Sequence, residues 1–113
     1  MKLLLASQRI HEFPEVGERR DTLDQRFISF FHTCGYMIAP IPNFPSINSV
    51  NDFLVKFLER LMPDGIVISG GDNIGVYAER DLTEFELLTY AKKRNVPVLG
   101  ICRGMQVLGV YEG

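Results

Sequence analysis

The sequence predicts an α/β fold, a three-layer αβα sandwich with a mostly parallel sheet. Two observations carry this prediction. Four short apolar runs are spread along the 113 residues, and each is followed by a stretch whose apolar side chains recur at helical spacing. Successive strand–helix units of this kind favour a parallel sheet, with right-handed crossovers that place helices on both of its faces.

The first two units occupy the first half of the chain. Residues 2–6 predict a strand, and residues 20–33 predict a helix with Gly35 at its C-cap. The apolar side chains of that helix are Leu23, Phe27, Phe30 and Phe31. A strand over residues 36–41 ends at Pro42-Asn43, and Ser49 with Asp52 has capping-box spacing before the next helix. One face of this second helix carries Phe53, Leu54, Phe57, Leu58 and Leu61. Residues 8–18 are the longest stretch predicted to be irregular.

The second half repeats the arrangement. The β-branched run at residues 66–69 is typical of a strand buried on both faces. A third helix follows, with Asp81 and Glu84 at capping-box spacing and Leu82, Phe85, Leu88 and Ala91 predicted to face inward. The apolar residues 96–100 form the fourth strand, and a fourth helix begins at Arg103.

Composition excludes several classes of protein. Apolar residues make up 46% and charged residues 23%, which does not favour a disordered chain. The net charge of −2 does not favour nucleic acid or an anionic membrane as a partner. The apolar run in "MKLLLAS" is too short for a signal peptide, and no stretch is long enough to span a membrane. Two cysteines, Cys34 and Cys102, make neither a disulfide framework nor a metal set, which points to a reducing, cytoplasmic compartment.

The most distinctive motif is "GICRG", residues 100–104, at the end of the fourth strand. This is the spacing of a nucleophile elbow with cysteine in place of serine. A sharp turn from strand to helix strains the middle residue, lifts Cys102 into solvent and needs small residues on both sides of it. The helix N-terminus behind Cys102 favours a thiolate, and the Arg103 N–H is placed to donate to an oxyanion. The alternative is a buried cysteine in a junction that needs glycine only for packing. Cys34, predicted on the apolar side of a helix C-terminus, is interpreted as a structural residue.

A glycine pair in "GGDNIG", residues 70–75, follows the third strand. It lacks the spacing and lysine of nucleotide-binding loops. Ligands of open α/β sheets bind outside the carboxyl ends of the strands, so this loop and the cysteine turn share one edge. The Gly71 N–H is therefore predicted as the second oxyanion donor. The alternative is a glycine-rich turn without a function.

The strings "GGDNIG", "ERDLTEFELLTYA" and "VPVLGICRGMQVLGV" resemble class I glutamine amidotransferase-like enzymes, and more closely their γ-glutamyl hydrolase branch, peptidase C26. The resemblance covers essentially the whole chain in order and implies a flavodoxin-like fold. It implies Cys102 as catalytic nucleophile, Gly71 and Arg103 as oxyanion donors, and Gln106 and Gly70 as contacts of a bound γ-glutamyl group. The implied reaction is hydrolysis of a γ-glutamyl amide through a γ-glutamyl thioester, with no cofactor and no metal.

The sequence departs from the family at the catalytic base. Family members carry a His-x-Glu pair late in the chain, whereas the histidines here are His11 and His32, both before Cys102. His32 is expected at the surface or the boundary of the first helix, and a substrate role for His11 stays open. We expect residues 1–113 to be the N-terminal portion of one glutamine amidotransferase-like domain, cut off after the nucleophile elbow and inactive as a hydrolase by itself.

The first loop offers groups suited to a carboxylate or phosphate: Gln8, Arg9, Arg19 and Arg20. Together with "GYMIAPIPN" it resembles a subgroup whose substrate is a γ-glutamyl-CDP-amidate in capsule biosynthesis, and Arg9 is the candidate for binding it. Two other functions stay open. One is a glutaminase subunit that supplies ammonia to a synthase partner, and the other is a non-enzymatic or redox-sensing member of the fold. A homodimer is also left open.

Overall fold

The central sheet of the computed structural model, which describes residues 1–44 and 50–113, has four parallel strands in the order β4-β1-β5-β6. The strands are β1 (Lys2–Ala6), β4 (Tyr36–Pro40), β5 (Gly65–Ile68) and β6 (Val98–Gly100). The predicted α/β class with a parallel sheet is confirmed, and each predicted strand lies within two residues of its expected bounds.

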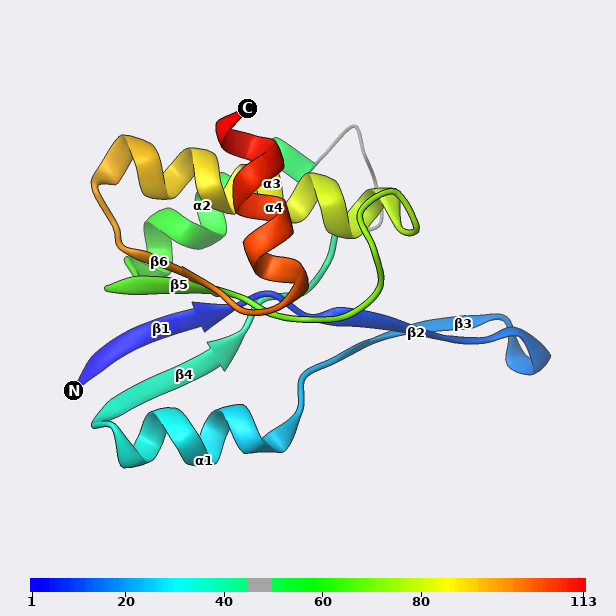
Figure 1. Cartoon of the computed structure of the whole chain (residues 1–113), viewed down its shortest axis with the longest axis horizontal. Helices are drawn as coiled ribbons and strands as arrows, with labels where there is room; N and C mark the ends of the chain where they lie inside the picture. The colour runs from blue at the N-terminus through cyan, green and yellow to red at the C-terminus, as the bar shows by residue number, and fades with distance from the viewer. Residues whose placement is uncertain (45–49) are drawn as a thin grey trace.

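Helices cover both faces of this sheet (Figure 1). Helix α1 (Gln25–Thr33) lies on one face, while α2 (Val50–Leu61), α3 (Ala78–Arg94) and α4 (Arg103–Glu112) lie on the other. Strand β5 is buried along its whole length and alternates between the two cores, with Ile66 and Ile68 facing the larger one and Val67 facing the smaller. The predicted three layers are therefore confirmed.

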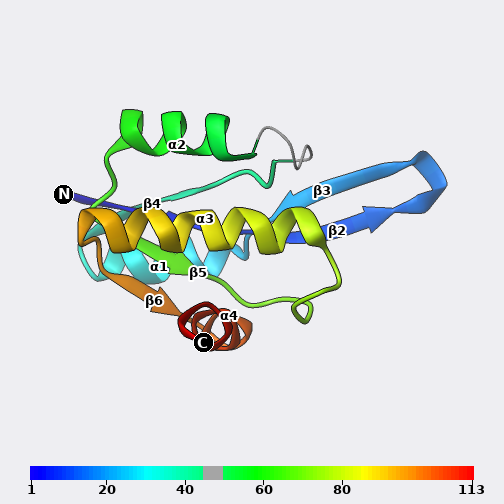
Figure 2. The same ribbon diagram turned by 90° about the horizontal axis from the view of Figure 1, so that it is seen from above.

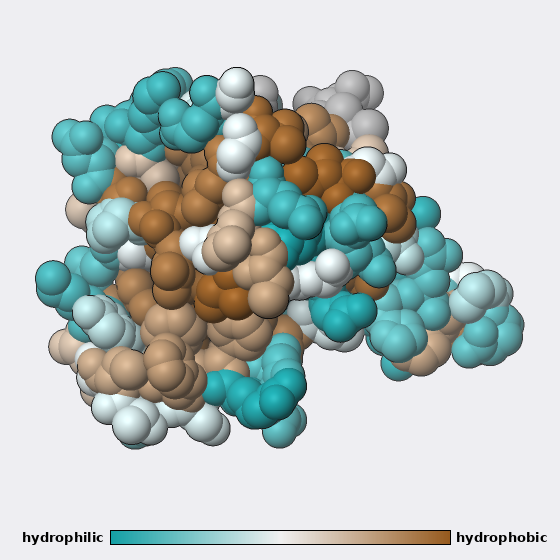
Figure 3. Space-filling view, viewed as in Figure 1, coloured by the Kyte–Doolittle hydropathy of each residue, from teal (hydrophilic) through white to brown (hydrophobic). Residues whose placement is uncertain are grey.

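The first correction concerns residues 8–18, which were predicted to be irregular. All of them except Gln8 belong to an antiparallel hairpin of β2 (Arg9–Phe13) and β3 (Glu18–Thr22), joined by a short 3₁₀ turn over Pro14–Val16. The hairpin projects away from the sheet, and its far end is hydrophilic (Figures 1, 2 and 3). Because most of its residues are exposed on both faces, the alternation of apolar and polar residues that predicts a strand is missing.

The second correction concerns the first helix, which begins at Gln25 rather than Arg20. Asp24 is its N-cap and accepts a hydrogen bond of 2.9 Å from the Arg26 amide, while the residues before it are paired in β3. Of the predicted apolar face only Phe31 is buried, and Phe30 is 61% exposed. Cys34 caps the helix and is exposed, so the interpretation of a cysteine packed on the apolar side is wrong.

The third correction concerns α3, whose N-cap is Tyr77 and not Asp81. Its buried face carries three polar side chains beside apolar ones: Arg80, Thr83, Glu84, Leu87, Leu88 and Ala91. The spacing of Asp81 and Glu84 therefore does not mark a capping box. For α2, Ser49 lies outside the described residues; on its predicted apolar face Leu54 and Leu58 are buried, but Phe53 is 61% exposed.

Over the described residues, none of the helices combines the length and the apolar character that crossing a membrane requires.

Candidate functional site

The carboxyl ends of β5 and β6 bring the two glycine-containing motifs together. Ile101 continues the pairing of these strands, since its amide donates to the Ile68 carbonyl at 3.0 Å. A Cβ placed on Gly70 would lie 3.7 Å from the Cβ of Cys102, so the glycine pair passes directly beside the cysteine. The predicted meeting of the two loops at one sheet edge is thus present in the structure.

Cys102 occupies a strained turn. Its backbone has φ 53° and ψ −112°, a conformation that L-residues with side chains adopt rarely and at an energetic cost. Cys102 is the N-cap residue of α4, makes no side-chain cap bond, and is exposed. The alternative of a buried cysteine used for packing does not agree with this exposure.

The two glycines of the motif are required by close packing. A Cβ at Gly100 would lie 2.6 Å from Leu108 Cδ1 and 2.7 Å from the Gly104 carbonyl oxygen. A Cβ at Gly104 would overlap the Ile68 carbonyl oxygen and lie 2.9 Å from the carbon of that carbonyl. Strand β6 lies too close to helix α4 for a side chain at residue 100, and strand β5 lies too close to α4 for one at residue 104. This agrees with the prediction of small residues on both sides of Cys102.

Two backbone amides at this turn are unengaged. Within residues 1–44 and 50–113, the N–H groups of Gly71 and Arg103 donate no hydrogen bond. Gly71 has φ +144° and its backbone is exposed, and Arg103 is the first residue of α4. Free N–H groups next to a cysteine, one of them at a helix N-terminus, are suited to stabilise negative charge.

A pocket of about 280 Å³ opens beside the cysteine. One side of its lining comes from the ends of β5 and β6 and the two motifs that follow them: Ser69, Gly70, Gly71, Ile101 and Cys102. The other side comes from the base of the hairpin and the start of α1: Arg9, Thr22, Leu23, Asp24 and Phe27. Hydrogen bonds from the Arg26 side chain and amide lower the pKa of Asp24 to about 2, so this pocket carries a carboxylate as well as the Arg9 guanidinium.

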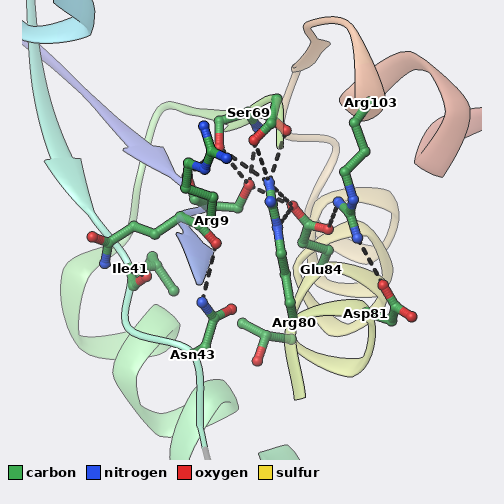
Figure 4. A network of polar contacts seen from close by, with 12 residues as sticks. Arg9, Ile41, Asn43, Ser69, Arg80, Asp81, Glu84 and Arg103 are labelled. Carbon is green, nitrogen blue, oxygen red and sulfur yellow. Dashed lines mark hydrogen bonds and ion pairs between the residues drawn. The ribbon is translucent and has the colours of Figure 1, made fainter. Parts of the chain in front are cut away.

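Behind the pocket lies a buried polar network centred on Glu84 (Figure 4). The Glu84 carboxylate accepts hydrogen bonds from Ser7 Oγ at 2.6 Å, from Arg80 Nε at 3.2 Å and from Arg103 Nη1. Arg103 Nη2 also donates to Asp81 at 2.7 Å. The side chains of Arg80, Glu84 and Arg103 are at most 3% exposed, so these charges depend on one another for solvation.

The histidines do not join this site. His11 is exposed in β2, where its ring stacks on Phe13 at 4.7 Å between centroids, and His32 is exposed in the last turn of α1. Neither is among the described residues that line the pocket. No group of His, Cys, Asp or Glu in the described part of the chain is arranged to hold a metal ion.

Comparison with known proteins identifies the family. The model of the peptidase C26 family matches residues 4–113, nearly the whole chain. The chain belongs to the peptidase C26 family. The resemblance inferred from the three sequence strings is therefore confirmed.

Curated relatives of this peptidase C26 chain have several functions. It is 29% identical to gamma-glutamyl-gamma-aminobutyrate hydrolase of Escherichia coli O157:H7, over 86% of the chain and 41% of the relative. It is 28% identical to anthranilate synthase component 2 of Saccharolobus solfataricus, over 75% of the chain and 43% of the relative. It is 35% identical to CTP synthase of Methanosphaera stadtmanae, over 57% of the chain and 11% of the relative. The chain thus spans less than half the length of these relatives.

In this peptidase C26 chain, the candidate site residues inferred from sequence fall into two groups. Cys102, Gly70, Gly71 and Arg9 all line the pocket. Arg103 lies at the turn, but its side chain is buried and points to Glu84 (Figure 4). Gln106 is exposed on α4 and is not among the described residues that line the pocket.

Ser7 lies at a strand end where ligands of such sheets are predicted to bind, but the contacts of Arg80 and Glu84 with the site were not predicted. The available signal was the acidic and basic residues of "ERDLTE", which were interpreted as an ordinary helix start.

Proposed function

We propose that this chain supplies the nucleophile and the oxyanion donors of a cysteine-dependent hydrolase acting on γ-glutamyl amide bonds. The observation that carries the proposal is the exposed Cys102 on a strained turn, with Gly71 lining the same pocket and Arg103 following the cysteine. The amides of both residues have no hydrogen-bond acceptor within residues 1–44 and 50–113. Membership of peptidase C26 and the likeness to a gamma-glutamyl-gamma-aminobutyrate hydrolase support the substrate class.

The proposed chemistry has two steps. The Cys102 sulfur attacks the γ-carbonyl carbon, a C–S bond forms, and the carbonyl oxygen becomes an oxyanion that the two amides stabilise. The C–N bond then breaks, and the amine leaves with the proton that the thiol has lost. Water next attacks the thioester carbon, the C–S bond breaks, and glutamate leaves while a proton returns to the sulfur.

Both steps need a group that carries the proton between sulfur, amine and water. Because His11 and His32 lie away from the pocket, the proposal assigns them no part in this transfer. The test is therefore designed around the first bond to sulfur rather than around turnover.

Labelling with a glutamine-analogue diazoketone tests the proposal. We expect one label per chain, located on Cys102 by peptide mass spectrometry, and a labelling rate that falls when glutamine is added. Cys34→Ser is the matched control, since Cys34 is also exposed but lies at the end of α1, and it should label like the parent chain. Cys102→Ser should not label. Equal labelling of both cysteines, or no competition by glutamine, would contradict the proposal.

A second candidate is a glutaminase that hands ammonia to a synthase partner. The names of two relatives, anthranilate synthase component 2 and CTP synthase, favour it. The two candidates share the Cys102 chemistry and differ in the acceptor. Labelling of Cys102 by the glutamine-analogue diazoketone at the same rate with and without a synthase favours the hydrolase, and labelling that needs a synthase favours the glutaminase.

For the substrate, we propose a γ-glutamyl conjugate with a nucleotide leaving group, a γ-glutamyl-CDP-amidate, with Arg9 as a phosphate contact. The pairing of the other two hairpin arginines supports the choice of Arg9. Arg19 pairs with Glu79 at 2.6 Å and Arg20 pairs with Glu18 at 2.6 Å. The Arg9 guanidinium has no ion-pair or hydrogen-bond partner among the described residues, and Arg9 lines the pocket.

Binding of cytidine diphosphate to Arg9→Ala tests this role. We expect an affinity at least tenfold below that of the parent chain, because hydrogen bonds to a charged group contribute about 1.5–3 kcal/mol. Isothermal titration calorimetry at fixed salt measures it. Arg20→Ala, on the opposite strand of the same hairpin, is the control and should bind like the parent. Equal affinity of the Arg9 variant would remove Arg9 from nucleotide recognition.

A further inference from the structure

The orientation of the Gly70–Gly71 peptide depends on Arg80. Arg80 Nη2 donates to the Ser69 carbonyl at 2.9 Å and to the Gly70 carbonyl at 3.0 Å, so a single nitrogen holds two successive carbonyls of the loop (Figure 4). The same nitrogen lies 3.3 Å from Ser69 Oγ. The start of the glycine loop is thus anchored on its inner side.

Holding the Gly70 carbonyl also sets the direction of the next N–H. The described chain has no cis peptide bond, and in a planar trans peptide the C=O and the following N–H point in opposite directions. With the Gly70 oxygen turned inward to Arg80, the Gly71 N–H is turned outward. The outer side of this peptide is the pocket that Gly70 and Gly71 line together with Cys102.

Without Arg80, little would fix this peptide. Glycines on both sides give it a wide choice of backbone angles, including the φ of +144° at Gly71. A Cβ on Gly71 would overlap Arg80 Nη1 and lie 3.0 Å from Arg9 Cβ. The guanidinium therefore fills the space that a side chain at residue 71 would need.

Arg80 is held in turn by the carboxylate that also binds Arg103. Glu84 Oε2 accepts from Arg80 Nε, and Glu84 Oε1 accepts from Arg103 Nη1. Asp81 joins Arg103 Nη2 to the Gly75 amide, at 2.7 and 2.8 Å, and so fixes the far end of the glycine loop. Glu84 thus binds both Arg80, which holds the Gly70 carbonyl, and Arg103, whose backbone N–H is the second candidate oxyanion donor.

Burying the Arg80 guanidinium has a desolvation cost that a purely structural role does not explain. Arg80 is 1% exposed, burial lowers the pKa of its guanidinium from the ordinary value, and its Nη1 has no hydrogen-bond partner among the described residues. A buried ion pair of this kind often stabilises a fold no better than apolar side chains of similar volume. A role in orienting the loop explains why a cation is placed there.

We propose that Arg80 is a positioning residue that holds the Gly70–Gly71 peptide with the Gly71 N–H directed at the carbonyl oxygen under attack by Cys102. The inference rests on the proposed function, because it assigns the Gly71 amide to an oxyanion. It adds to that function a residue that touches neither the substrate nor the sulfur.

Two reagents separate this role from the general reactivity of the thiol. A γ-glutamyl aldehyde forms a tetrahedral adduct with the Cys102 sulfur, and its oxygen needs the oxyanion donors. Iodoacetamide alkylates the same sulfur at a CH₂ carbon and forms no oxyanion. The dissociation constant of the aldehyde, compared with the rate of alkylation, therefore reports the donors and not the exposure of the thiol.

For Arg80→Met, we expect aldehyde affinity to fall by about 10- to 100-fold while the iodoacetamide rate changes less than twofold, since loss of one oxyanion donor costs up to about 100–1,000-fold. Arg80→Lys keeps the charge beside Glu84 and protects the fold, but lacks the second nitrogen of the fork, so it should lose aldehyde affinity to an intermediate extent. Arg94→Met is the matched control on the same helix, since the Arg94 side chain is 59% exposed.

Three results would overturn the inference. They are unchanged aldehyde affinity in both Arg80 variants, parallel loss of aldehyde affinity and alkylation rate, and equal effects in Arg80→Met and Arg94→Met. Failure of the proposed function looks different, because the parent chain itself would then bind the γ-glutamyl aldehyde no better than acetaldehyde. That result would remove the inference together with the function on which it rests.

Discussion

Gly104→Ala is expected to lower the free energy of unfolding by about 3 kcal/mol, the upper part of the range for overpacked sites. The added methyl group would overlap the Ile68 carbonyl oxygen and lie 3.3 Å from Ile68 Cβ. Ile68 cannot retreat easily, because β5 is an inner strand between β1 and β6. Urea unfolding followed by circular dichroism measures the change.

Gly109→Ala is the matched control in the same helix. Within residues 1–44 and 50–113 no atom lies within 4 Å of a Cβ built on Gly109. Alanine favours the helix by about 0.5–1 kcal/mol over glycine. The two substitutions should therefore change stability in opposite directions. A loss of similar size in both variants would show that helix α4 and not its contact with β5 is sensitive to the change.

Glu84→Gln is expected to lower the free energy of unfolding by about 3–5 kcal/mol, the cost of breaking a buried ion pair from one side. The substitution keeps the shape of the side chain but leaves Arg80 and Arg103 without the carboxylate that they share. Both guanidinium groups are almost fully buried, so water cannot replace the lost charge. Denaturant unfolding at neutral pH measures the difference.

Glu18→Gln removes the same charge from an exposed pair and serves as the comparison. Glu18 and Arg20 have side chains 49% and 55% exposed, and such pairs contribute about 0–1 kcal/mol. A Glu84 variant that loses no more stability than the Glu18 variant would mean that the network relaxes and that water reaches it.

The strands and the cysteine turn could be predicted because their signals are local. The run at 65–68 is apolar at every position, as expected for a strand buried on both faces. The spacing of Gly100, Cys102 and Gly104 is a local signal of the sharp turn from β6 into α4, where Gly100 packs against α4 and Gly104 packs against Ile68 of the neighbouring strand β5. The hairpin could not be predicted in the same way, because strands exposed on both faces have no apolar periodicity.

The polar network could not be predicted for a different reason. Ser7 and Glu84 are 77 residues apart, and Arg80, Glu84 and Arg103 come from two helices on the same face of the sheet. In the sequence, Asp81 and Glu84 have the spacing of a helix cap, and only the start of α3 at Ala78 excludes it. Local patterns do not distinguish a carboxylate that caps a helix from one that binds two buried cations.

The fold class, the family and the cysteine turn follow from the sequence because their signals are patterns of neighbouring residues: the repeated strand–helix units, the three family strings and the glycine spacing around Cys102. The tertiary structure decided which cations remain available and how the glycine loop is held. Glu79 and Glu18 pair with Arg19 and Arg20, whereas Arg9 has no ion-pair partner within residues 1–44 and 50–113. The Gly70 carbonyl faces inward because Arg80 binds it. Such hydrogen bonds and ion pairs depend on charge and burial, and they form only when packing brings groups from different elements within hydrogen-bond distance.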